Sequence, residues 1–196
     1  MKPYVRILIL FVSIIFSCKK DDTNVIFTLP AKTQSGKNIF GFLNNSLVWT
    51  NYGQVCFPFA GGCSENLQGI FYISDGDIFI HADRVLNKVR SGDTREFIDL
   101  YLTTKFRGAH NYSTAAFDSV SVGYRFKQQG QEEKLYLLSR FNPDFNITIS
   151  KIDTINKILS GEFSGKLFKR TNLATFETST TDSIIVAVGR FDIKMK

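Results

Sequence analysis

The chain has two histidines, and only one of them lies in a pattern that could do chemistry. In the segment Asp77–Asp83, residues two apart place Asp77, His81 and Asp83 on one face of a strand. Two carboxylates and an imidazole on a single face could bind a divalent metal ion. A strand face that is merely solvated requires polar residues of the same kind. We prefer this second interpretation and predict no metal site.

Other signatures of catalysis are absent from the sequence. There is no Gly-x-Ser-x-Gly elbow, no His-Glu-x-x-His, no Cys-x-x-Cys and no phosphate-cradling glycine loop. The second histidine, His110, has Asn111 and Tyr112 beside it and no carboxylate. Most acidic residues, such as Asp75 and Asp153, lie at turn signals, where turn chemistry explains them. We therefore predict neither an enzyme nor a cofactor.

The first seventeen residues have the features of an export signal. Lys2 and Arg6 precede the apolar residues 7–16. This run is shorter than the roughly 20 residues that span a membrane, and it suits the apolar core of a signal peptide. Ile15-Phe16-Ser17-Cys18 resembles the lipobox of bacterial lipoproteins, which implies cleavage before Cys18 and a lipid on its thiol. An ordinary signal peptide with a chance cysteine is the alternative.

The residues after Cys18 carry a further resemblance. Lys19-Lys20-Asp21-Asp22 is similar to the export tag of Bacteroidota lipoproteins, and the alternative is a polar tether without meaning. The resemblance implies that a lipid anchor holds the protein on the outer membrane, facing the cell surface. The formal charge is +6, or +4 without Lys2 and Arg6, and no basic run has interleaved aromatic residues. We therefore expect no nucleic-acid partner.

The two remaining cysteines, Cys56 and Cys63, form an even pair. An exported chain meets an oxidising compartment, so we predict a disulfide between them. They lie in the irregular segment 51–69, which also carries Tyr52, Phe57 and Phe59. A short cross-linked loop would hold aromatic rings with little entropy left to lose, which makes it a possible ligand-binding loop. Alternatively, and in our preferred interpretation, the phenylalanines fold inward and cap the core.

The rest of the chain alternates between short strand-like runs and turn signals. Asp75-Gly76 is the strongest hairpin signal, and Asn44-Asn45 marks another tight turn. The only candidate helix is His81–Arg90, and a first short strand is possible at Val25–Leu29. This pattern predicts an all-β fold, an antiparallel β-sandwich or barrel, with Trp49 buried on a strand.

The predicted organisation is a signal peptide at 1–17, a lipidated tether at 18–37 and one all-β domain at 38–196. The segment Gly41–Trp49 resembles the opening of a family of uncharacterised Bacteroidota outer-membrane lipoproteins, in which a glycine-rich strand and turn lead to a tryptophan. Ile147–Ser164, with an Asp/Asn turn before a Ser-Gly-x-Phe strand, and the closing Gly189–Ile193 are similar to further signatures of that family. The family implies no known activity.

Three functions are compatible with these features. The first is a non-catalytic surface module that binds a glycan or an outer-membrane protein, which an exposed aromatic platform would favour. The second is a structural envelope protein without a small ligand, which a smooth polar surface would favour. The third is a hydrolase, which a deep cleft lined by two carboxylates would favour.

Overall fold

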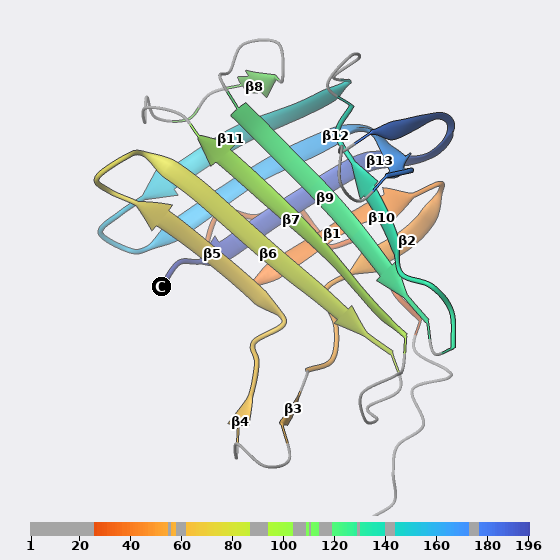
Figure 1. Ribbon diagram of the computed structural model, residues 1–196. Helices are drawn as coiled ribbons and strands as arrows, with labels where there is room; N and C mark the ends of the chain where they lie inside the picture. Colours follow the sequence, from red (N-terminus) through yellow and green to blue (C-terminus); the bar gives the residue numbers. More distant parts are fainter. Residues whose placement is uncertain are drawn as a thin grey trace, which may run out of the picture.

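The computed structural model describes residues 26–54, 56–57, 62–86, 94–103, 109, 111–113, 119–128, 130–139, 144–172 and 177–196. Every regular element in these ranges is a β-strand, which confirms the predicted all-β fold (Figure 1). Within the same ranges no helix is long and apolar enough to cross a membrane.

The strands form one large antiparallel sheet and one small hairpin. Their bounds are β1 (Ile39–Asn44), β2 (Leu47–Thr50), β3 (Cys56–Phe57), β4 (Gly62–Cys63), β5 (Leu67–Tyr72), β6 (Asp77–Val85), β7 (Arg95–Thr103), β8 (Asn111–Ser113), β9 (Ser119–Lys127), β10 (Lys134–Leu137), β11 (Phe145–Asp153), β12 (Ile158–Arg170) and β13 (Thr178–Lys194). The main sheet has the order β2-β1-β13-β12-β10-β9-β7-β6-β5, β11 pairs with β12 and β8, and β3 pairs with β4.

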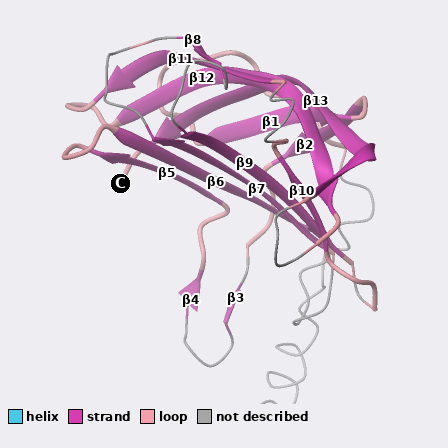
Figure 2. Cartoon of the chain, turned by 45° about the horizontal axis from the view of Figure 1, so that its top comes forward, coloured by secondary structure: helices cyan, strands magenta, loops and turns pink. Residues whose placement is uncertain are grey.

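The main sheet curls into a half-barrel. Figure 2 shows β11, β12 and β13 arching over β5, β6, β7 and β9, so that the two halves of one sheet face each other. Just beyond β2, Tyr52 makes an isolated parallel bridge to Arg84 of β6. The edge strand β2 is thereby tied to the opposite half of the sheet at one end.

The core fills the space between the two halves. Alternate residues of β6 and β7 point into it, and Ile78, Ile80, Ile98 and Leu100 have no exposed surface. This is the alternation of period two that the sequence shows. Trp49 is also fully buried, as predicted, and its ring stacks on Phe42 at a centroid distance of 4.9 Å.

Glycines allow phenylalanine rings to lie directly on the neighbouring backbone. A Cβ on Gly161 would lie 2.4 Å from Cζ of Phe191, and one on Gly189 would lie 2.6 Å from the ring of Phe163. The pairing of β13 with β1 and with β12 shifts register near Val188, whose φ is 52°. Such a bulge bends a strand and increases its twist, which helps the sheet to curl.

Turns and strand ends differ from the sequence-based expectations in several places. The segment 51–69, expected to be irregular, contains β3, β4 and the start of β5. The first hairpin turns at Asn45 and Ser46, both with positive φ, one residue later than predicted. The candidate helix at His81–Arg90 is wrong for its described residues, 81–86, because β6 continues to Val85 and Ala82 packs in the core; residues 87–90 lie outside the described ranges. Of the proposed strand at Val25–Leu29, the described residues 26–29 are not a strand.

Asp192 fastens the segment before β1 to the sheet. Its buried carboxylate accepts hydrogen bonds from Thr33 Oγ1 at 2.6 Å, Gly36 N at 2.8 Å and Ser160 Oγ at 2.7 Å. Burial alone would raise the pKa of Asp192, but these hydrogen bonds outweigh it and lower the pKa to about 2. The described part of the predicted tether, residues 26–37, is thus held against the domain at this point.

Replacement of Gly161 by alanine should destabilise the protein by about 1–3 kcal/mol or more, because the new methyl group overlaps Phe191 and the carbonyl oxygen of Thr148. Chemical denaturation measures this loss as a fall in the free energy of unfolding. Gly62→Ala is the matched control, since a Cβ there meets nothing within 4 Å. Equal stability of the two variants would show that the rings do not require Gly161.

Candidate functional site

The outward positions of β6 and β7 bring aromatic and charged side chains together. The register pairs Phe79 with Tyr101, His81 with Asp99, and Asp83 with Phe97. These six residues and Arg95, at the start of β7, are called the outer aromatic face below. They lie on the side of the two strands opposite the core residues such as Ile80 and Leu100.

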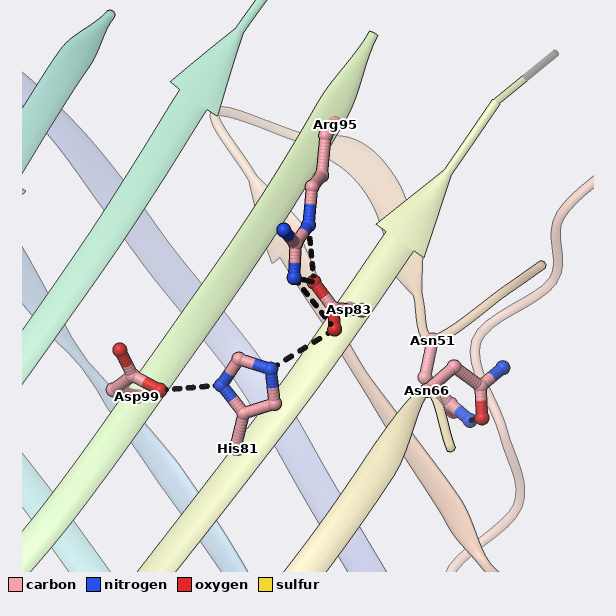
Figure 3. Close-up of polar contacts among 6 residues, drawn as sticks. All are labelled: Asn51, Asn66, His81, Asp83, Arg95 and Asp99. Carbon is pink, nitrogen blue, oxygen red and sulfur yellow. Dashed lines mark hydrogen bonds and ion pairs between the residues drawn. The ribbon is translucent and has the colours of Figure 1, made fainter. Parts of the chain in front are cut away.

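His81 lies between two carboxylates at the centre of this face (Figure 3). Its Nδ1 is 2.6 Å from Oδ1 of Asp99, and its Nε2 is 2.9 Å from Oδ2 of Asp83. Burial would lower the pKa of His81, but the hydrogen bonds and charges of the two aspartates outweigh burial and raise the pKa to about 9. At neutral pH His81 is therefore an imidazolium that donates from both nitrogens.

Asp83 is the buried end of this chain of charges, with 2% of its surface exposed. Arg95 donates to it from Nε at 3.0 Å and from Nη2 at 3.2 Å. Burial would raise the pKa of Asp83, yet His81 and Arg95 lower it. The backbone N–H of Asp83 donates to the carbonyl of Asn66, and its carbonyl accepts from Tyr52 N, so neighbouring segments hold Asp83 on both sides.

This arrangement leaves His81 without the lone pair that a general base or a metal ligand needs. Asp77, the third residue of the sequence pattern, accepts a hydrogen bond from the Tyr101 hydroxyl at 2.7 Å instead of meeting His81. Among the described residues, no group of three or more His, Cys, Asp or Glu is arranged to hold a metal ion. The hydrogen-bonded group of His81, Asp83, Asp99 and Arg95 is consequently suited to fixing the positions of side chains rather than to transferring protons.

Aromatic rings surround the charged chain. The rings of Phe97 and His81 have centroids 5.6 Å apart. The guanidinium groups of Arg95 and Arg125 lie over the Phe97 ring, 5.4 and 5.2 Å from its centroid. Phe79 stacks on the other side of His81 with centroids 6.4 Å apart. Phe79, Phe97 and Tyr101 are half-buried, so their rings are held in place and still reach the surface.

A second candidate site is a half-open pocket at the end of the half-barrel where β1 turns into β2. The pocket, called the end pocket below, has a volume of about 310 Å³. Its floor holds the buried carboxylate of Glu96, which accepts hydrogen bonds from Trp49 Nε1, Arg84 Nη2 and the Tyr124 hydroxyl. Burial and the charge of Glu96 raise the pKa of Tyr124, so this hydroxyl stays protonated and donating.

The loop proposed as a binding site is only partly described. Tyr52 is half-buried, and its ring meets that of Phe27 edge to face at 5.2 Å. The backbone places Cys56 directly opposite Cys63 in the β3–β4 hairpin. The side chain of Phe57, and all of Phe59 and Cys18, lie outside the described residues.

Sequence reasoning missed Asp99, Arg95 and Glu96. Asp99 alternates with Phe97 and Tyr101 in the sequence, but only the register of β6 against β7 shows that it faces His81. Glu96 alternates with Ile98 and Leu100 and so lies on the same, otherwise apolar face of the strand. A carboxylate in that position could have been recognised from the sequence as unusual. The chain matches no protein-family model, no curated protein and no solved structure.

The imidazole of His81 should titrate in NMR spectra with a midpoint near pH 9, well above its ordinary value of 6.5. Because the pKa is raised on folding, His81 stabilises the fold fully below about pH 6.5, and this contribution is lost as the pH rises through 9. Asp99→Asn should move the midpoint down, and His110→Gln assigns the resonance. A midpoint of 6.5 in the parent protein would contradict the ion-pair chain.

Proposed function

We propose that the protein is a lipid-anchored, non-catalytic module that binds glycans on the outer aromatic face. One observation carries this proposal: half-buried aromatic rings lie on a sheet beside the partly exposed carboxylate of Asp99 and guanidinium of Arg95. Such a face supports a binding module over a structural protein with a smooth polar surface.

The chemistry of sugars fits the side chains of this face. Sugar rings have apolar C–H surfaces, which the exposed parts of the Phe79 and Tyr101 rings can contact. Sugar hydroxyl groups donate and accept hydrogen bonds, and the side chains of Asp99 and Arg95 are 35% and 43% exposed. Charged partners strengthen such hydrogen bonds. Both kinds of contact are therefore available within a few residues of one another.

The ion-pair chain supports binding over catalysis. His81 ties Asp83 on its own strand to Asp99 on β7, and Arg95 closes the chain on Asp83. Side chains that are fixed before the ligand arrives lose little conformational entropy on binding, which raises affinity. The end pocket, in turn, has one carboxylate, Glu96, among its lining residues, whereas glycoside hydrolysis uses a pair.

Features of the sequence support a location at the outer membrane. The lipobox at Cys18 supports an anchor in the outer membrane, and the following lysines and aspartates support display at the cell surface. Several acyl chains would hold such an anchor, since each buried methylene contributes about 0.8 kcal/mol. The opposition of Cys56 and Cys63 in the β3–β4 hairpin supports a disulfide between them.

Removal of the ring of Phe79 and the carboxylate of Asp99, in Phe79→Ser with Asp99→Ala, should weaken glycan binding at least about tenfold. Affinity electrophoresis in gels that contain laminarin, xylan or dextran measures the retardation of each variant. Ile155→Ser is the matched control, since Ile155 is 91% exposed and lies in the turn after β11. If the parent protein is not retarded by any of these polysaccharides or retained on a glycan array, the structural-protein alternative replaces the proposal.

Intact-mass measurement of protein extracted from membranes checks the cysteine assignments. The parent should begin at Cys18 and carry the added mass of acyl chains, and Cys18→Ala should lack that mass and leave the membrane fraction. Cys56 and Cys63 should resist alkylation until a reductant is added. An unmodified parent that still carries residues 1–17 would contradict the lipoprotein assignment, and alkylation without reductant would contradict the disulfide.

A further inference from the structure

We propose that the end pocket is a second binding site, which takes a small amphipathic carboxylate. The pocket is lined by core-facing residues such as Trp49, Glu96 and Tyr124, whereas the outer aromatic face lies on the opposite side of β6 and β7. The proposal therefore stands independently of glycan binding, and either can fail without the other.

The size of the pocket limits the ligand. Its volume of about 310 Å³ is at the lower end of the range for small-molecule sites and equals that of about ten water molecules. A ligand of about ten non-hydrogen atoms fills such a space. The pocket is open to solvent beside the β1–β2 turn, where Asn45 and Leu47 form part of its wall.

The buried carboxylate on the floor is already neutralised. Oε2 of Glu96 accepts from Trp49 Nε1 at 2.7 Å and from the Tyr124 hydroxyl at 2.5 Å, and Oε1 accepts from Arg84 Nη2 at 2.6 Å. These donors come from three different strands, so the carboxylate is held from several sides. A cationic ligand would have to displace a strong charge-assisted hydrogen bond to reach it.

The cations of the pocket outnumber its anions. Arg84 and Lys134 line it against the single carboxylate of Glu96. The Nε of Arg84 is buried and has no hydrogen-bond acceptor among the described residues, a condition that costs free energy. The guanidinium is held between Phe27 and Trp49, 5.6 and 5.7 Å from their ring centroids. Glu96 balances the charge of Arg84, so the charge left over in the lining is that of Lys134, which an anionic ligand would balance.

Part of the pocket wall is apolar. Phe126, Ile184 and Val48 line it, and Leu47 at its edge has 75% of its surface exposed. An exposed leucine beside a concave apolar surface gains from contact with an alkyl or aryl group. The pocket thus offers an apolar surface and an excess of positive charge. A carboxylate with a short hydrocarbon chain complements both.

The single tryptophan of the chain makes the test direct, because Trp49 lines the pocket and its fluorescence reports occupancy. Titration with octanoate should change the emission saturably, whereas octylamine and octanol, with the same chain length, should bind more weakly. Lys134→Gln and Leu47→Ser should each weaken octanoate about fivefold. Lys37→Gln, which changes an exposed lysine that does not line the pocket, should bind as the parent does.

Two-dimensional NMR provides a second measurement that does not depend on the indole. Octanoate should shift the amide resonances of Leu47 and Ile184 and leave those of Phe79 and Asp99 in place. Absence of saturable binding in both measurements would overturn the proposal. So would equal affinity for octylamine or octanol, or unchanged affinity in both Lys134→Gln and Leu47→Ser.

Discussion

The close packing of phenylalanine rings on glycine backbone is the constraint on which the rest of the structure depends. The rings of Phe163 and Phe191 occupy the space that a side chain on Gly189 or Gly161 would fill. Two strands can therefore approach while large rings lie between the halves of the sheet. The curled sheet also brings Tyr52, just beyond β2, into a bridge with Arg84 of β6. The end pocket is lined from both halves, by Trp49 of β2 and by Arg84 and Glu96 of β6 and β7.

The two charge clusters lie on opposite sides of the same two strands. On the outward side of β6 and β7, His81 joins the buried Asp83 to the partly exposed Asp99. On the inward side, Arg84 and Glu96 form an ion pair that is largely shielded from water. Buried charges are tolerated only when they are paired and hydrogen-bonded, and Trp49 and Tyr124 complete the shell of Glu96. Both clusters therefore fix how β7 lies against β6.

Much of the fold could be predicted from the sequence, because alternation and turn residues are local signals. The hairpin at Asp75-Gly76 and the burial of Trp49 are examples. The helix proposed from His81 failed because the segment was short and its apolar spacing ambiguous. The ion pairs of His81 could be predicted only in part, because Asp99 lies eighteen residues away from His81 in the sequence. The register that joins them is a property of the whole sheet rather than of either segment.

The hydrogen bonds that join Asp192 to the segment before β1 restrict the order in which the chain can fold. These hydrogen bonds join residues up to 159 positions apart, so the beginning and the end of the domain meet at one carboxylate. Loop closure over such separations is entropically costly, and folding of proteins rich in distant contacts is slow. β13 is the last strand of the chain and lies between β1 and β12. Because β1 and β12 are joined only through β13, the sheet cannot become continuous until β13 has paired with both of them.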